Sequence, residues 1–201
     1  VIDVRKDDEL KHISYNDGTI TKNKLWIGLC HLKETEDLGY FGYLTKNNFE
    51  VVDRKFKVSN GPAIDEKNNK LYFSDSFNSK VYQYNLKNFE RKTLIKLKKK
   101  DGFPDGIALD NNNGLWVAHW AGAKVSRINL KNGKLDFSIS LPALNITSAT
   151  FIGKNLNHLF ITSAKYGVTG KLLRRYPHSG SSFIIKTDYK GVKIPYTNIN
   201  F

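Results

Sequence analysis

The sequence contains no methionine and a single cysteine, Cys30, and it has no long apolar run. One cysteine excludes a disulfide within the chain and suits a reducing compartment, so we expect a cytoplasmic protein. No segment reaches the roughly 18 apolar residues that a membrane helix needs, and the charged opening VIDVRKDDELK lacks the apolar core of a signal peptide. We therefore expect no membrane partner. The absence of Met leads us to expect that position 1 follows processing, an unusual start codon or a longer upstream sequence.

Acidic residues are also in short supply. The chain has 19 of them against 32 Lys and Arg, which gives a formal net charge of +13. This charge suits a nucleic-acid or other anionic partner, or it reflects only an excess of Lys spread over loops. The one dense basic group is KLKKK at 96–100, and no nucleic-acid-binding motif accompanies it. We therefore do not expect nucleic acid as a partner.

What the sequence does contain is a repeat of short apolar and aromatic segments separated by Asn, Asp, Gly and Lys. Four segments begin with Leu and an aromatic residue, at spacings of 46, 44 and 44 residues: Leu25-Trp26, Leu71-Tyr72, Leu115-Trp116 and Leu159-Phe160. With the apolar segments around them, they give about four strands per repeat. A repeat of about 45 residues with four strands is typical of a β-propeller blade. The sequence therefore predicts an all-β chain, a single propeller domain over residues 1–201 with about four blades.

The first strand of each predicted blade opens on polar residues, with TS at 147–148 in the last blade. Asn16, Asn60 and Asp105 stand 44 and 45 residues apart, one blade each. In a propeller the first strands line the central channel, so these oxygen-bearing side chains are expected to meet at one mouth, where they suit Ca²⁺, Mg²⁺ or Mn²⁺. The alternative is turn chemistry, because Asn-Gly and Asp-Gly are among the commonest turn dipeptides. We favour a site, because three such residues stand in phase with the repeat.

Other polar residues are weaker candidates. We expect His119, beside Trp120, to pack rather than to react, and we expect Asp75 and Asp110 to be strand-end or turn carboxylates. The histidines lack the spacing of metal ligands. Cys30 has no predictable partner that would make it a nucleophile.

These residues stand in blocks that resemble the gluconolactonase family, also called the senescence marker protein or regucalcin family. The similarity is carried by YNDGTI, VSNGPAIDEKNNKLYFSDS, GFPDGIALDNNNGLWVAHWAGAKVSRINLKNGKL, LPALNITSATFIGKNLNHLFITSA and GSSFIIKTDYKGVKIPY, and it extends from about Asp3 to the C-terminus. The resemblance implies a six-bladed propeller with one divalent cation, Ca²⁺, Zn²⁺, Mn²⁺ or Mg²⁺, at the channel mouth. It also implies the hydrolysis of sugar lactones to aldonic acids.

The same resemblance implies roles for individual residues. Asn60 and Asp105 fall on positions that ligate the cation, and Asp105 falls in addition on the general base. Asn16, with Asp17 beside it, falls on the position that contacts the substrate. The expected ligand is therefore a small-molecule sugar lactone.

The chain departs from the family pattern in two places. The block that supplies a Glu ligand from the first blade has no counterpart, and the chain begins about two blades late, so a preceding segment or a partner chain is expected to close the ring. Ser14 stands where the family often has Arg. Glu34 and Glu36 are candidates to stand near the pocket. These departures motivate an alternative function, a non-catalytic propeller fragment that binds a metal ion or a partner and has lost the Glu ligand.

Overall fold

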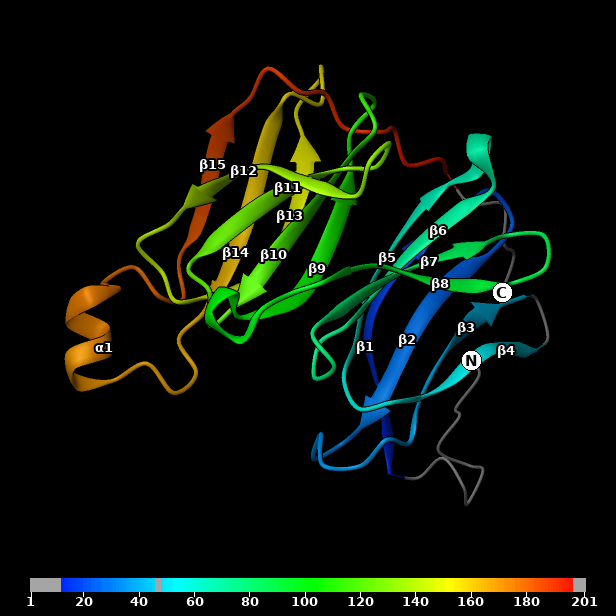
Figure 1. Ribbon diagram of the computed structural model, residues 1–201, viewed down its shortest axis with the longest axis horizontal. Coiled ribbons are helices and arrows are strands. Elements are labelled where there is room, and N and C mark those ends of the chain that lie inside the picture. The colour runs from blue at the N-terminus through cyan, green and yellow to red at the C-terminus, as the bar shows by residue number, and fades with distance from the viewer. Residues whose placement is uncertain (1–11, 46–47, 197–201) are drawn as a thin grey trace.

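The computed structural model describes residues 12–45 and 48–196 (Figure 1). In this part of the chain fifteen strands form four antiparallel sheets, and strands that are consecutive in sequence are neighbours in each sheet. The first sheet contains β1 (Ile13–Ile20), β2 (Leu25–His31), β3 (Gly39–Leu44) and β4 (Phe49–Phe56). The second contains β5 (Ser59–Asp65), β6 (Lys70–Asp75), β7 (Lys80–Asn85) and β8 (Arg91–Lys96).

The third sheet repeats this pattern of four strands, and the fourth has three strands in the described residues. The third contains β9 (Phe103–Leu109), β10 (Gly114–Trp120), β11 (Lys124–Asn129) and β12 (Lys134–Ser140). The fourth contains β13 (Asn145–Ile152), β14 (His158–Ala164) and β15 (Ser182–Lys186). The four Leu-aromatic pairs of the sequence repeat lie on the second strand of each sheet, β2, β6, β10 and β14. Each repeat therefore forms one blade, as the sequence predicts.

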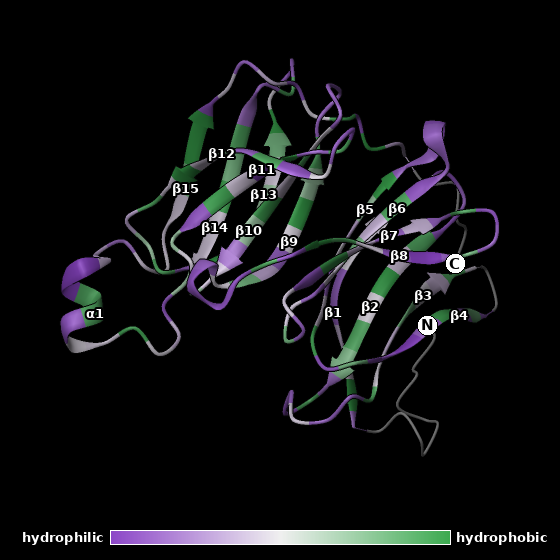
Figure 2. Cartoon of the chain, in the orientation of Figure 1, coloured by the Kyte–Doolittle hydropathy of each residue, from purple (hydrophilic) through white to green (hydrophobic). Residues whose placement is uncertain are grey.

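Apolar side chains of neighbouring sheets face one another and form the core. Between the first two sheets, Trp26 and Phe41 pack with Phe73 and Tyr84, and the ring centroids of Phe41 and Phe73 are 4.3 Å apart. Similar clusters join the second sheet to the third and the third to the fourth. Figure 2 shows the apolar stretches along the second strands. A single sheet cannot cover both of its faces, so stacking the blades supplies the hydrophobic stabilisation.

The first strands stand side by side in the order β1, β5, β9 and β13, each packed against the next. The first and fourth sheets lie at the two ends of this series, on opposite sides of the molecule in Figure 1. The arrangement confirms the predicted propeller architecture with about four blades. It also gives the first strands a shared inner surface, and the beginnings of these strands meet at one end of it.

One helix lies where the sequence predicts only strands and loops. It is α1 (Gly170–Arg175), in the connection between β14 and β15. Its six residues are too few to show the 3.6-residue apolar period by which helices are predicted. No helix in the described ranges is both long and apolar enough to cross a membrane.

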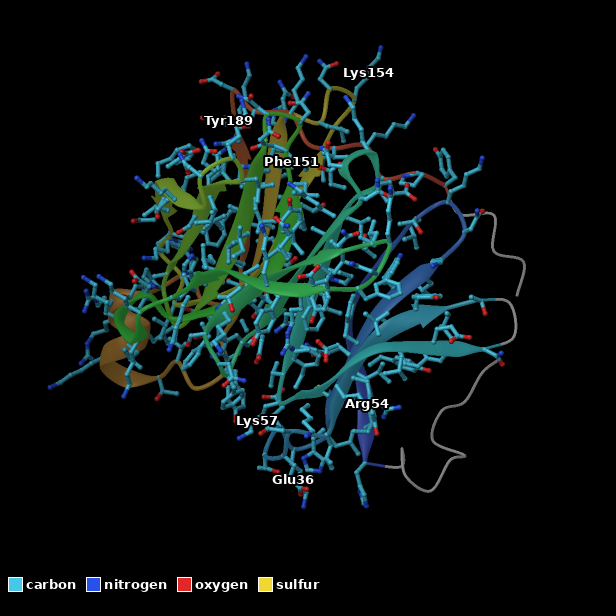
Figure 3. The ribbon with its side chains drawn as sticks, turned by 45° about the vertical axis from the view of Figure 1, so that its right-hand side comes forward. Glu36, Arg54, Lys57, Phe151, Lys154 and Tyr189 are labelled. Carbon is cyan, nitrogen blue, oxygen red and sulfur yellow. The ribbon has the colours of Figure 1, made fainter. Side chains whose placement is uncertain are left out.

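A buried ion pair holds the third sheet together. The Arg127 Nε donates to the Asp110 Oδ2 over 2.7 Å, and the two side chains are 3% and 0% exposed. The Asp110 carboxylate also accepts hydrogen bonds from Gly114 N at 2.9 Å and Trp116 Nε1 at 2.8 Å. The ring centre of Tyr189, a residue labelled in Figure 3, lies 4.1 Å from the guanidinium carbon of Arg127. Asp110 is thus a turn carboxylate, as predicted, and it is at the same time a buried charge with a full set of partners.

Candidate functional site

A β-bulge interrupts each first strand near its beginning. The register shifts between Tyr15 and Asp17 in β1, after Asn60 in β5, and between Ile146 and Ser148 in β13. In β9 the shift falls between Pro104 and Ile107, opposite β10. A bulge bends the strand and redirects a side chain out of the regular alternation.

The bulges position the residues that the sequence singles out. Asn16 and Asp105 lie inside a bulge, and Asn60 directly precedes one. The turn interpretation of these residues is therefore wrong, because all three lie within strands. Gly61 follows Asn60 with a φ of +78°, and a Cβ there would come within 2.9 Å of the Ile107 side chain. Glycine is needed at this bulge for both reasons.

A chain of hydrogen bonds joins these residues across three blades. The Asn16 Nδ2 donates to Asn60 Oδ1 and to the Ser59 carbonyl, each over 2.7 Å. The Asn60 Nδ2 donates to Ser76 Oγ over 2.9 Å, and Ser76 Oγ donates to the Pro104 carbonyl over 2.6 Å. The first, second and third blades are therefore fixed to one another at the residues that form the site.

Asp17 adds a second link between the first two blades. Its Oδ2 accepts a hydrogen bond from Gly61 N at 3.0 Å, and its Oδ1 accepts one from Gly18 N at 2.8 Å. Burial raises the pKa of Asp17, while these two backbone hydrogen bonds act to lower it. The carboxylate thus lies where its charge is only partly compensated.

These side chains open onto one cavity of about 580 Å³. Its size is in the range of small-molecule sites, which runs from roughly 300 to 1,000 Å³. It is lined by Asn16, Asp17, Glu34, Val58, Asn60, Ser76, Phe77, Phe103, Asp105, Trp120, Thr147, Ser148 and Tyr166. The structure thus places all four of the predicted site residues in the wall of the same cavity. Figure 3 shows Lys57, next to the lining residue Val58, near the same end of the molecule as Glu36 and far from Phe151 at the other end.

A second cavity, of about 590 Å³, lies further along the first strands. Asp17 and Ser148 line both cavities, and Phe151 and residues 192–195 line the far part of the second. We take the first cavity as the candidate site, because Asn16, Asn60 and Asp105 line it and do not line the second.

The cavity is acidic although the chain is strongly basic. No Lys or Arg is among its lining residues in the described part of the chain, whereas Asp17, Glu34 and Asp105 are. Desolvation in the concave wall, together with the charges of Asp17 and Glu34, raises the pKa of Asp105 to about 8. A hydrogen bond from the Gly106 backbone opposes this shift. Perturbed carboxylates of this kind are typical of functional sites.

The donor chemistry of the cavity fits a hard divalent cation. Asp105 and Asn60 offer carboxylate and amide oxygens, which Ca²⁺, Mg²⁺ and Mn²⁺ prefer. The raised pKa of Asp105 shows a carboxyl group that lacks a compensating positive charge. In residues 12–45 and 48–196, no three His, Cys, Asp or Glu side chains are gathered closely enough to hold a metal ion by themselves. Asp105 and Asn60 stay the predicted cation ligands, and Asp17 and Glu34 are the other carboxylates in the cavity wall.

Glu34 and Glu36 differ in their placement. Glu34 lines the cavity, in a left-handed backbone conformation with a φ of +54°. Glu36 instead lies with its Oε1 3.9 Å from the His31 Nε2. Of the two candidates, only Glu34 reaches the cavity and acts on the charge of Asp105.

The sequence interpretation missed several lining residues. Ser76 directly follows β6 and Trp120 is the last residue of β10, and the two stand 44 residues apart, at equivalent positions of the repeat. The repeat therefore contains the pattern that would have found them. Phe77 and Tyr166 come from loops, where the repeat gives no alignment. His119 packs as predicted, since it is 1% exposed and its Nδ1 lies 2.7 Å from the Asp101 carbonyl.

The shift of Asp105 predicts a dependence of stability on pH. Its pKa in the folded protein, about 8, lies above the ordinary value of 3.8. The folded protein thus keeps a proton that the unfolded chain releases, and the free energy of unfolding should fall as pH rises from about 4 to 8. In metal-free protein, Asp105→Asn should remove this loss and raise the free energy of unfolding at pH 8 by on the order of 1–3 kcal/mol.

Urea unfolding at pH 5 and pH 8 measures this effect. The gain from Asp105→Asn should be larger at pH 8 than at pH 5. The exposed Asp188 offers a matched control, because Asp188→Asn should leave the stability nearly unchanged at both values. Equal gains at the two pH values would contradict the raised pKa.

Four propeller blades with an acidic cavity where the first strands begin define a propeller protein with a candidate ligand site. Comparison with known proteins identifies its family. Residues 2–165 match the family model described as the SMP-30/Gluconolactonase/LRE-like region. The chain therefore belongs to this family.

Individual relatives give the same result. Regucalcin of Danio rerio is 36% identical over 199 residues, which cover 94% of this chain and 67% of the relative. Regucalcin of Homo sapiens is 32% identical over 158 residues, which cover 76% of this chain and 51% of the relative. The chain thus spans about two thirds or less of the length of these relatives.

Solved structures share the fold. The calcium-binding protein regucalcin from Agrobacterium tumefaciens superposes with a TM-score of 0.85 at 21% identity, covering 94% of this chain and 66% of that one. A gluconolactonase from Xanthomonas campestris gives a TM-score of 0.60 at 19% identity, covering 74% of this chain and 53% of that one. At these identities the similarity supports the propeller architecture alone.

Proposed function

We propose that this chain carries the site of a divalent-metal-dependent hydrolase that opens sugar lactones. The observation that carries the proposal is the convergence of Asn16, Asn60 and Asp105 from three neighbouring blades on one acidic cavity. Membership of the gluconolactonase-like family supports the reaction class. A cytoplasmic location remains a prediction that rests on the single Cys30, and the absence of a nucleic-acid partner remains a prediction as well.

Asn60 and Asp105 would hold the cation from two neighbouring blades. When bound, the cation would supply Lewis-acid polarisation of the lactone carbonyl and stabilise the charge that develops on its oxygen. Asn60 is pre-oriented for this role, since its Oδ1 is fixed by Asn16 and its Nδ2 by Ser76. Buried and fully bonded side chains of this kind cost little reorganisation when a ligand binds.

Asp105 is in addition the proposed general base. Its carboxylate accepts a proton from the attacking water while the water oxygen bonds to the lactone carbonyl carbon. In the following step the carbonyl re-forms, the ring C–O bond breaks, and Asp105 returns the proton to the departing ring oxygen. The pKa of about 8 belongs to the metal-free protein; a cation held by Asp105 would lower this pKa and keep the carboxylate deprotonated, as a base requires. Asp105 thus takes up the proton within the cavity that holds the substrate.

Asn16 and Asp17 are the proposed substrate contacts. The amide nitrogen of Asn16 is committed to Asn60 and Ser59, so its Oδ1 is the atom that faces a substrate hydroxyl. Asp17 fixes the bulge of β1 against Gly61 and adds negative charge beside Asp105. Together they orient a lactone ring against the proposed base.

Cation binding and turnover test this proposal together. We expect hydrolysis of glucono-1,5-lactone above the buffer rate with Ca²⁺, Mn²⁺ or Zn²⁺, and loss of that rate with chelator. Asn60→Ala should weaken cation affinity by about 10- to 100-fold in calorimetry, because it removes one of two protein ligands. Asn111→Ala, an exposed residue outside the cavity, is the matched control and should bind as the unchanged protein does. If no cation supports hydrolysis of the lactone, the proposed hydrolase function is wrong.

A second candidate is a non-catalytic metal- or partner-binding propeller fragment. The observation that favours it is the lack, in the described ranges, of three acidic, His or Cys ligands gathered in one place. Cation binding that Asn60→Ala abolishes, without turnover of any lactone, would support this candidate over the enzyme.

A further inference from the structure

Asp105 stands near the beginning of β9, so its place depends on how the start of this strand is held. The register of β9 on β10 pairs Pro104 with His119 and then shifts, so Asp105 lies in the bulge with no residue of β10 paired opposite it. On this side the strand is fixed by Pro104 and by the two residues that precede β9, Asp101 and Gly102. The contacts of these residues therefore decide where the Asp105 carboxylate lies.

The residues before β9 lie directly against the end of β10 and the turn that follows it. A Cβ on Gly102 would collide with the Trp120 carbonyl oxygen, and a Cβ on Gly122 would collide with the Asp101 carbonyl oxygen. Because both approaches are too close for any side chain, the two segments are in contact through their backbones. A shift of one segment therefore moves the other.

Two side chains hold Asp101 in this contact. His119 is 1% exposed, and its Nδ1 lies 2.7 Å from the Asp101 carbonyl oxygen. Burial lowers the pKa of His119 to about 4, so the ring is neutral near pH 7. Since a carbonyl oxygen can only accept, Nδ1 carries the proton and Nε2 is an acceptor. The Lys124 Nζ donates to Asp101 Oδ1 over 2.7 Å.

Packing alone does not explain a histidine at position 119. Its Nε2 is buried and has no hydrogen-bond partner among the residues that the structure describes. A buried acceptor without a partner costs free energy, which an apolar side chain of similar size avoids. Local features that cost stability are expected where function requires them. The hydrogen bond from Nδ1 to Asp101 is an interaction that an apolar side chain cannot replace.

We propose that His119 is a positioning residue, which holds the start of β9 through Asp101 and thereby sets the place of the Asp105 carboxylate. His119 does not touch the cation or the substrate, since it is buried and is not among the residues that line the cavity. The inference rests on the proposed role of Asp105 as cation ligand and base, and it adds a residue outside the cavity wall. Residues that orient a metal ligand in this way typically contribute about 10- to 100-fold to metal affinity.

Two substitutions separate this role from packing. His119→Leu keeps the space filled, and it removes both the hydrogen bond to Asp101 and the unpaired Nε2. His119→Asn is smaller, but its Nδ2 can donate from the place of Nδ1. We expect the urea midpoint to be higher for His119→Leu than for His119→Asn, because the smaller side chain leaves a cavity and a buried amide oxygen.

Cation affinity should follow the opposite order. In calorimetry with Ca²⁺ and with Mn²⁺, each alone, His119→Leu should bind about 10- to 100-fold more weakly than the unchanged protein, and His119→Asn within about threefold of it. His178→Leu replaces an exposed histidine outside the cavity and should leave the affinity unchanged. If His119→Leu does not fold, His119→Phe takes its place, because it keeps a ring and lacks the donor.

Hydrogen exchange tests the same role without a cation or a substrate. The Gly106 backbone N–H donates to the Asp105 carboxyl group, so the exchange of this amide reports on the β9 bulge. In metal-free protein, His119→Leu should speed the exchange of Gly106 by at least about tenfold, and His119→Asn should not.

The outcomes are distinguishable. If the affinities of the two variants follow their urea midpoints, His119 acts by packing and the proposal is wrong. If His119→Leu binds the cations as the unchanged protein does, the proposal is also wrong, and the proposed hydrolase function is unaffected. If the unchanged protein binds no cation, the proposed metal site fails, and the exchange of Gly106 still decides whether His119 holds the bulge.

Discussion

Asp105→Asn is expected to lower the rate of lactone hydrolysis by at least about 1,000-fold. The substitution removes the proposed base, which typically accounts for a factor of about 10² to 10⁴, and it also replaces a charged cation ligand by a neutral one. Asparagine keeps the shape of the side chain in the β9 bulge. Initial rates with glucono-1,5-lactone, at saturating cation, measure the effect.

The control for this prediction is built into the same variant. Because Asp105→Asn should make the metal-free protein more stable at pH 8, a loss of activity cannot be assigned to unfolding. Asp188→Asn replaces an exposed carboxylate outside the cavity and should keep full activity. A variant that retains more than about a tenth of the rate would exclude Asp105 as the base.

The largest effect on stability is expected from Asp110→Ala, at about 3–5 kcal/mol of lost free energy of unfolding. The change leaves the guanidinium of Arg127 buried without its main partner. It also removes the acceptor for Gly114 N and Trp116 Nε1, both of which are buried. Unpaired buried groups of this kind are costly because water cannot replace the lost partner. The urea midpoint, with an unchanged slope, gives the loss.

A more exposed ion pair provides the matched comparison. Arg91 and Asp53 make the same kind of contact at 2.8 Å, with side chains that are 40% and 26% exposed. Arg91→Ala should therefore cost no more than about 1 kcal/mol. If Asp110→Ala and Arg91→Ala lower the free energy of unfolding equally, the burial of the Asp110–Arg127 pair does not explain how much that pair stabilises the fold.

The repeat made the blades and much of the site predictable. Leu and an aromatic residue recur at a fixed interval because each blade must present the same buried strand to its neighbours. The polar residues at the starts of the first strands follow the same interval, so Asn16, Asn60 and Asp105 were identified together. Their presence in the wall of one cavity agrees with that prediction. Their roles in catalysis and binding remain proposals.

Other features depend on contacts that no local pattern encodes. The bulges resemble turns in sequence, because the same Asn-Gly and Asp-Gly pairs suit both, and only strand pairing distinguishes them. The hydrogen-bond partners of the Asp110 carboxylate lie up to 17 residues away along the chain. Tyr166 reaches the cavity from the connection between β14 and β15, which is longer than the equivalent connections of the other three blades. Position along the repeat does not predict such contacts, because each depends on the packing of particular loops.

The bulges also determine which substitutions the cavity can accept during evolution. A side chain inside a bulge lies outside the alternation that the core imposes on the rest of the strand, so its identity is not constrained by packing between the blades. The fourth blade carries Thr147 where the first and third carry Asn16 and Asp105. A single substitution at one bulge can therefore exchange one ligand-bearing group without disturbing the register of the sheet. The chemistry of the mouth is open to alteration one blade at a time, because the apolar clusters between the blades do not include these side chains.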